Sequence, residues 1–139
     1  MRALLAAILL SPALLWGQSV CFVHSKLVPP LTEVSLSGAN PFQYNSAQKR
    51  EYPFIVPAGQ ELRITTAVLS VKLLRNGRAS MLVLDNVIAV TAHAPVVRFE
   101  PGVVMPAGAV VTGRLINNDE FESQWMGSVV CGVLEVVQP

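Results

Sequence analysis

The sequence has little of what catalytic and metal-binding proteins need. It contains only two histidines, His24 and His93, and neither stands near a Gly-x-Ser-x-Gly or similar nucleophile turn. It has no Cys/His zinc pattern and no phosphate loop, since its glycines are scattered as turn residues. A glycosidase needs two carboxylates that flank a sugar bond, and nothing in the sequence selects such a pair. We therefore expect a protein that is not an enzyme and that uses no cofactor and no metal.

Charged residues are also scarce, at 14% of the chain against a typical value of about 25%. Arg2 is the only charged residue of the leader described below, and without it nine basic residues balance nine acidic ones. A formally neutral chain lacks the basic excess that holds nucleic acid or an anionic membrane. We expect neither as the main partner.

The first 19 residues have the layout of a secretory signal peptide. A short positive start is followed by an apolar run from Ala3 to Trp16 and then by the small residues Gly17 and Ser19. The run falls short of the roughly 20 apolar residues that span a bilayer. We expect cleavage after Gly17 or Ser19 and export of the mature chain to the periplasm or the extracellular space. The alternative is an N-terminal anchor or a buried helix.

Beyond the leader, no segment repeats its apolar residues at helical spacing. About eight short strand-like stretches follow one another instead, spaced roughly 8–12 residues apart, with Gly/Pro turns between them. This pattern predicts one all-β domain over residues 20–139. We expect a two-sheet antiparallel β-sandwich that is jelly-roll-like or immunoglobulin-like.

Cysteine is limited to Cys21 and Cys131. In an oxidising compartment an even number of cysteines favours pairing, which would join the two ends of the mature chain. We predict a disulfide, and the alternative is two buried free thiols.

The strongest local signal is Asn76-Gly77 between two apolar runs. A type I′ turn needs positive φ at both central residues, so the pair predicts one hairpin from Leu62 to Val90. Arg75 and Arg78 would then face each other at the tip, either simply solvated or as a small contact for an anionic group on a partner. The predicted cross-strand pairs below the tip are Leu73–Ser80, Val71–Leu82 and Leu69–Leu84.

The first arm of this hairpin changes parity. Leu62 and Ile64 fall on one alternation and Leu69 and Val71 on the other. If both pairs are buried, the strand must change face between them, which predicts a β-bulge near Thr65-Thr66-Ala67.

One short pattern occurs twice, as Pro57-Ala58-Gly59 and Pro106-Ala107-Gly108. In both copies a short apolar stretch precedes the pattern and a new strand follows it. Proline fixes φ and glycine permits positive φ, so each copy ends one strand and turns into the next. The two copies either mark equivalent corners of a sandwich or are simply common turns.

Aromatic residues make up only 6% of the chain, and Trp125 is the one tryptophan outside the leader. A carbohydrate- or small-ligand-binding module would stack Trp125 on a sugar ring, helped by Tyr44 and by Asp119 and Glu122 of the acidic loop 117–122. The alternative for Trp125 is a core position at the start of a strand. The loop could supply oxygen ligands to calcium, but its spacing matches no defined calcium loop, which favours a solvated acidic turn.

The stretches Ala109–Ile116 and Val129–Val137 carry apolar residues on both faces. Strands of this kind occur in a thick core or at a subunit interface, and a domain of about 120 residues has little thickness to spare. The leading expectation is therefore an exported, non-catalytic binding or structural module that makes protein–protein or surface-assembly contacts, by self-association or with another protein. The carbohydrate- or small-ligand-binding module is the alternative.

Overall fold

The computed structural model describes residues 17–36, 43–44, 54–72, 79–83 and 88–138. Within these ranges the chain forms nine strands and no helix, so no described helix is long and apolar enough to span a membrane. The strands are β1 (Gln18–Val28), β2 (Thr32–Ser35), β3 (Gln43–Tyr44), β4 (Gln60–Val71), β5 (Ala79–Val83), β6 (Ile88–Thr91), β7 (Val96–Met105), β8 (Gly113–Asn117) and β9 (Gln124–Val136). The predicted leader, residues 1–19, lies mostly outside the described part of the chain.

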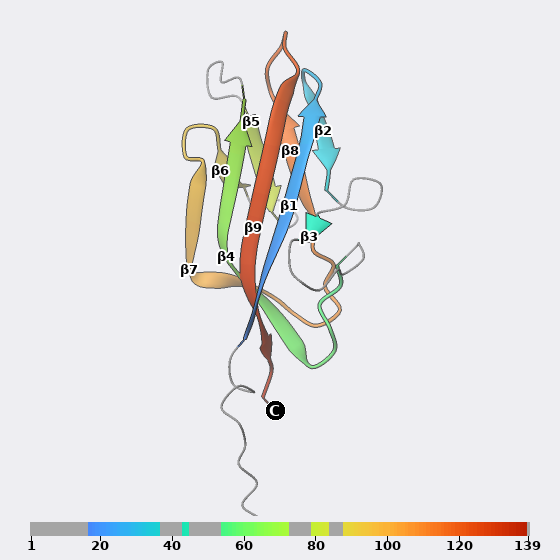
Figure 1. Ribbon diagram of the computed structural model, residues 1–139, viewed down its shortest axis with the longest axis vertical. Coiled ribbons are helices and arrows are strands. Elements are labelled where there is room, and N and C mark those ends of the chain that lie inside the picture. The colour runs from blue at the N-terminus through green and yellow to red at the C-terminus, as the bar shows by residue number, and fades with distance from the viewer. Residues whose placement is uncertain (1–16, 37–42, 45–53, 73–78, 84–87, 139) are drawn as a thin grey trace, which may run out of the picture.

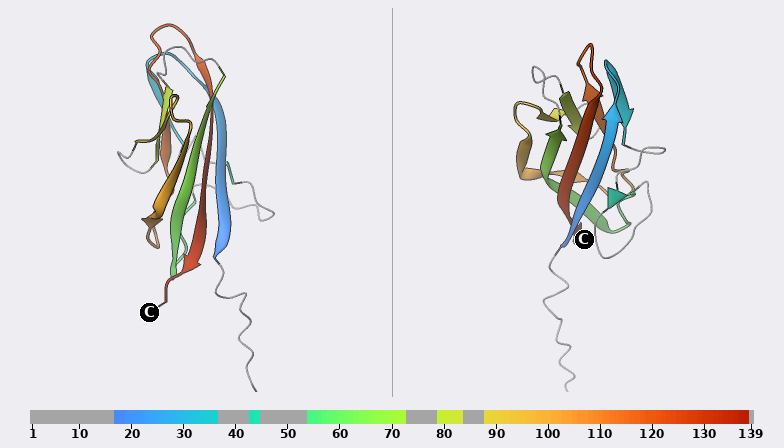
Figure 2. Two further views of the ribbon diagram at one scale, coloured as in Figure 1. Left: turned by 90° about the vertical axis from the view of Figure 1, so that its left-hand side faces the viewer. Right: turned by 45° about the horizontal axis from the view of Figure 1, so that its top comes forward.

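The strands form two antiparallel sheets (Figure 1). One has five strands in the order β3-β1-β9-β4-β7, and the other has four in the order β2-β8-β5-β6. Figure 2 shows the two layers from the side, with β9 at the centre of the larger one. The expectation of an all-β, antiparallel, two-sheet protein is confirmed.

The pairing of the strands is nested along the chain. β1 pairs with β9, β2 with β8, β4 with β7 and β5 with β6, each pair antiparallel. The chain thus doubles back on itself as one long ribbon of strand pairs. Successive pairs alternate between the two sheets, so the ribbon rolls around a common core.

The predicted hairpin from Leu62 to Val90 is wrong. β4 and β5 lie in different sheets: Val71 pairs with Met126, and Leu82 pairs with Arg114 and Ile88. β5 instead pairs antiparallel with β6, the next described strand. Two strands that face each other from opposite sheets turn alternate residues into the same core, so they show the same apolar parity as a hairpin. The predicted tip residues, Arg75 and Arg78, lie outside the described residues.

The core lies between the sheets and takes side chains from both. Phe22 of β1 is fully buried and packs edge-on against Phe54, with ring centroids 5.2 Å apart. Among the described residues, other large and fully buried side chains are those of Leu36, Leu62, Ile64, Leu115 and Met126. Because this core fixes one face of the five-stranded sheet, the residues of opposite parity form its outer face.

The predicted bulge in β4 is confirmed. The register of β4 shifts between Ile64 and Thr66 against both of its neighbours, and burial passes from Leu62 and Ile64 to Ala67. On the neighbouring strand, a Cβ added at Gly132 would collide with the carbonyl oxygen of Arg63. The bare glycine therefore lets the backbones approach closely beside the bulge.

The two Pro-Ala-Gly turns are equivalent and meet in space. Gly59 and Gly108 have positive φ, of 74° and 82°. The amides of Gln60 and Ala109 donate to Pro57 and Pro106 at 3.2 and 3.0 Å, as in type II turns. The Gly108 amide also donates to the carbonyl of Val56, which precedes the other turn, at 2.8 Å. The interpretation as equivalent corners is therefore favoured over that of unrelated common turns.

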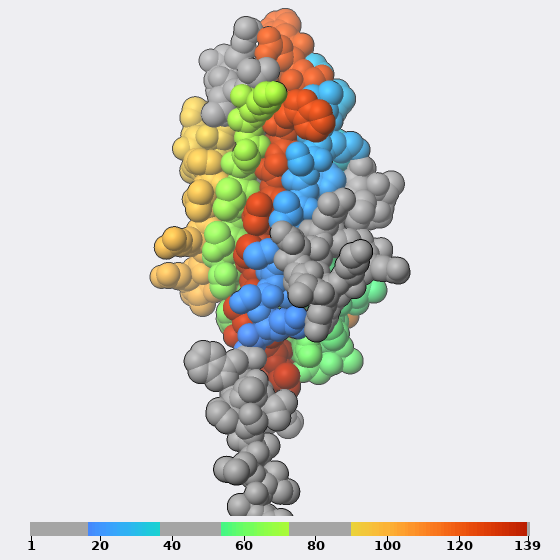
Figure 3. Space-filling model, in the orientation of Figure 1, coloured from blue at the N-terminus to red at the C-terminus, as the bar shows by residue number. Residues whose placement is uncertain are grey.

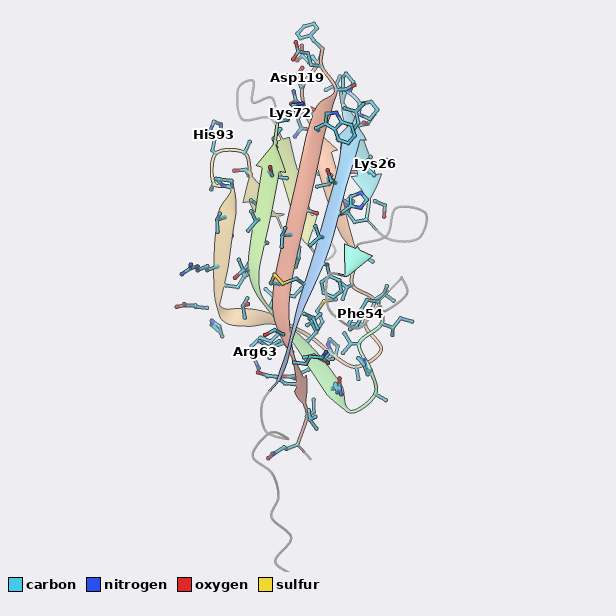
Figure 4. The ribbon with its side chains drawn as sticks, viewed as in Figure 1. Lys26, Phe54, Arg63, Lys72, His93 and Asp119 are labelled. Atoms are coloured by element: carbon cyan, nitrogen blue, oxygen red, sulfur yellow. A yellow bond between two sulfur atoms is a disulfide. The ribbon has the colours of Figure 1, made fainter. Side chains whose placement is uncertain are left out.

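The predicted disulfide is confirmed. Cys21 and Cys131 are register partners on β1 and β9, and their sulfur atoms are bonded. Both residues are half-buried and have the parity of the outer face. The bond lies over β1 and β9, as the yellow stick in Figure 4 shows.

Candidate functional site

Trp125 lies near the start of β9 on the outer face of the five-stranded sheet. Its neighbours Gln124 and Met126 are both buried, and Trp125 itself is 52% exposed. The alternative that places Trp125 in the core is therefore wrong. The outer face that carries it is the one turned to the viewer in Figure 3, with β1 in blue, β9 in red, β4 in green and β7 in yellow.

Strand pairing sets two side chains beside Trp125. Leu27 of β1 is its register partner on one side. On the other side, the amide of Lys72, which follows the end of β4, donates to the Trp125 carbonyl at 3.0 Å. Both neighbours are exposed, so the three side chains form a row across the end of the sheet.

The next row of the same face holds only small residues. Gly127 is paired with Ser25 of β1 and with Ser70 of β4. Beyond it comes a row of valines, Val23, Val129, Val68 and Val96. Because the middle row has no large side chain, the surface is hollowed between Trp125 and the valines.

This depression, here called the Trp125 hollow, has a volume of about 410 Å³ and is open to solvent. It is lined by Ser25, Ser70, Lys72, Trp125 and Gly127. Two interstrand spacings separate Ser25 from Ser70, which makes the floor roughly 10 Å wide. The hollow therefore presents one flat aromatic side, two hydroxyl groups and one ammonium group.

Tyr44 is not brought to this hollow. It pairs with Phe22 on β1, whereas Trp125 pairs with Leu27. Five residues of strand separate the two positions, a distance of about 17 Å along β1.

Asp119 and Glu122 lie in the loop between β8 and β9, and neither lines the hollow. Asp119 is only 5% exposed, and its Oδ1 accepts hydrogen bonds from the amides of Phe121 and Glu122 at 2.8 and 2.9 Å. This side chain shapes the loop from within. No group of three or more His, Cys, Asp or Glu within the described ranges could hold a metal ion.

Asn117 fixes the same loop to β1. It is 1% exposed, and its side-chain amide donates to the carbonyls of Val28, Pro29 and Glu122 at 3.0, 3.1 and 2.8 Å. Its Oδ1 accepts from the amide of Asp119 at 3.0 Å. The loop before Trp125 is therefore tied into the fold, and the start of β9 is held with it.

Two large apolar side chains are displayed at this end of the molecule. Phe121 is 81% exposed within the loop, and Leu31 is 67% exposed on the turn after β1. Leu31 has a φ of 50°, which is costly for a branched residue, and its amide donates to the Asp119 carbonyl at 3.0 Å. Figure 4 places Asp119 and Lys72 toward the same end of the sandwich.

Sequence reasoning missed Ser25, Ser70, Gly127 and Lys72 as site residues. These residues carry no motif, and only the register of β1, β9 and β4 gathers them. The one usable signal was Gly127, two positions after Trp125 and so on the same face of the predicted strand.

The charged group at the hollow is the ammonium group of Lys72. Two ion pairs on this sheet join Arg63 to Glu61 at 3.0 Å and to Glu135 at 3.4 Å, and Figure 4 places Arg63 toward the other end of the sheet from Lys72. Among the residues that the structure describes, no carboxylate forms an ion pair with Lys72. Its ammonium group therefore faces the solvent at the rim of the hollow.

Comparison of the chain with protein-family models, curated proteins and solved structures finds no match. The site must therefore be interpreted from its own chemistry.

Proposed function

We propose that this protein is an exported, non-catalytic binding module whose ligand site is the Trp125 hollow. The observation that carries the proposal is the exposed Trp125 beside a floor of Ser25, Gly127 and Ser70. A half-exposed indole ring contributes little to the core. Tryptophan is enriched where one flat face contacts a partner.

The ligand class that fits these groups is a saccharide. The C–H face of a pyranose ring is flat and apolar enough to cover an indole, and its hydroxyls need hydrogen-bond partners at the edges. Ser25 and Ser70 supply such partners on either side of Gly127. The hollow is within the usual range of ligand sites, about 300–1,000 Å³. A single stacked ring with few hydrogen bonds implies weak binding, with a Kd on the order of 1 mM for one sugar unit.

We further propose that the fold is a jelly roll. With the two-residue β3 set aside, the orders β1-β9-β4-β7 and β2-β8-β5-β6 are those of a rolled ribbon of eight strands. An immunoglobulin-like sandwich would keep its first two strands in one sheet, whereas β1 and β2 lie in different sheets. Jelly rolls serve both as lectin domains and as capsid units, so fold-level analogy does not choose between a sugar and an assembly partner.

Export is supported by the leader pattern over residues 1–19 and by the disulfide. A bond between Cys21 and Cys131 is compatible with an oxidising compartment such as the periplasm or the extracellular space.

A second function, protein–protein or surface-assembly contact, is favoured by one specific observation. Leu31 and Phe121 are held outward by a buried asparagine, a buried aspartate and a strained backbone rather than folded onto the sheet. Exposed apolar side chains on a rigid loop are typical anchors of protein interfaces. Self-association through them would appear as a dimer or larger species in size-exclusion chromatography with light scattering, and Phe121→Ala would abolish it.

The primary proposal is tested with a glycan array followed by titration of the best saccharide. Trp125 is the only tryptophan of the mature chain, so its fluorescence reports on the hollow alone. We expect a saccharide that changes this fluorescence and that Trp125→Ala no longer binds, while Phe121→Ala binds as the native protein does. Absence of any saccharide hit for the folded native protein would overturn the proposal.

A further inference from the structure

Lys72 places a positive charge at one edge of the Trp125 hollow. Among the described residues that line the hollow, Lys72 is the one with a charge, and none has a carboxylate. The hollow therefore has a cationic edge on the β4 side and an apolar edge at Leu27 on the β1 side.

The position of Lys72 is set by the fold rather than by chance exposure. Its backbone amide is bonded to the carbonyl of Trp125, which keeps the two residues abreast across β4 and β9. A ring stacked on Trp125 would therefore bring a substituent on its β4-side edge toward the Lys72 ammonium group. The Asp119 Oδ1, in the loop before β9, accepts hydrogen bonds from the amides of Phe121 and Glu122 within that loop.

We propose that the ligand of this hollow is an acidic saccharide, a sugar ring that bears a carboxylate or a sulfate, and that Lys72 is the specificity-determining residue that selects it. This inference rests on the proposed saccharide-binding function. A lysine ammonium is a point charge with three hydrogen-bond donors. It can therefore bind either a carboxylate or a sulfate without the fixed geometry that arginine requires.

The preference for acidic over neutral saccharides should be small, because the hollow is open to solvent. An ion pair near a protein surface is screened by water and salt, and exposed pairs contribute little. We expect acidic saccharides to bind about two- to fivefold more tightly than their neutral counterparts at low ionic strength, a range consistent with one partly exposed charge pair.

The test compares matched acidic and neutral forms of the same sugars, for example glucuronate, glucose 6-sulfate and glucose as methyl glycosides. Native protein and the variants Lys72→Gln, Lys72→Arg and Trp125→Ala are titrated by fluorescence or, for the last, by ligand-observed NMR. Arg98→Gln is the matched control, since Arg98 is exposed on the same sheet face but outside the hollow.

We expect Lys72→Gln to remove the preference by weakening the binding of the acidic sugars more than that of the neutral sugar, and Lys72→Arg to keep most of the preference. Raising the salt concentration should erase the preference in the native protein, and Arg98→Gln should change nothing. Comparison of the two acidic glycosides then distinguishes a carboxylate from a sulfate.

Two different failures are separable. If native protein binds neutral and acidic sugars equally, or if Lys72→Gln keeps the preference, the role of Lys72 is overturned and the saccharide site stands. If neither form binds the native protein in the array or the titrations, the proposed function falls together with this inference.

Discussion

Cys21 and Cys131 lie directly opposite each other on β1 and β9, with their Cα atoms 4.1 Å apart. Their disulfide spans 110 positions of sequence, yet it joins two strands that already share a hydrogen-bonded ladder near the middle of the larger sheet. It therefore closes the outermost pair of the nested ribbon, from which all other strand pairs follow inward.

Replacing both cysteines by serine should lower the free energy of unfolding by about 2–4 kcal/mol, because the unfolded chain loses a long covalent loop. Urea denaturation under oxidising conditions measures this loss. Reductant should bring the native protein close to the double variant and should leave the variant itself unaffected. A change below about 0.5 kcal/mol would mean that the ladder alone holds β1 to β9.

Asn117→Ala should destabilise the protein by roughly 2–4 kcal/mol. The substitution leaves the Val28, Pro29 and Glu122 carbonyls without a shared donor in a buried place, and unsatisfied buried groups cost free energy. Asn118→Ala, at the exposed next position, is the control and should stay within about 0.5 kcal/mol. Equal effects from both substitutions in thermal denaturation would argue against the anchoring role of Asn117.

The local features of the fold could be predicted from sequence, whereas the pairing could not. The bulge follows from a parity change between Ile64 and Leu69, and the paired turns follow from proline and glycine at fixed offsets. The failed hairpin depended on which strands pair. The alternation of apolar and polar residues around Val71 and Leu82 indicates only that both residues face a core. It does not distinguish two strands that lie side by side from two strands in opposite sheets.

Gly132→Ala tests the close approach of β9 to the bulged strand. An added Cβ would meet the Arg63 carbonyl oxygen, so the backbones must separate, and we expect a loss of at least about 2 kcal/mol. Gly127→Ala on the same strand is the matched control, because its Cβ would lie no closer than 3.7 Å to any other atom and should be tolerated. Similar denaturation midpoints for the two variants would contradict the close approach.

The candidate site was harder to predict than the fold for the same reason. The sequence marks Trp125 as a candidate ligand-binding residue, but β9 has apolar residues on both faces, such as Val129 and Val130, so its pattern leaves open which way Trp125 faces. Ser25, Ser70 and Gly127 are far apart in sequence and ordinary in type. Only the register of three strands makes them one floor.

The facing of β9 is itself open to a direct test with two adjacent residues. Trp125→Ala should cost at most about 1 kcal/mol, since the indole is half exposed, while Met126→Ala should cost about 2–5 kcal/mol because a fully buried side chain leaves a cavity. Acrylamide should quench the native fluorescence readily, as for a solvent-exposed indole. If Trp125→Ala proves the more damaging substitution in urea denaturation, or if acrylamide fails to quench, the indole belongs to the core. The hollow would then have no aromatic side, and neither a neutral nor an acidic sugar could stack there.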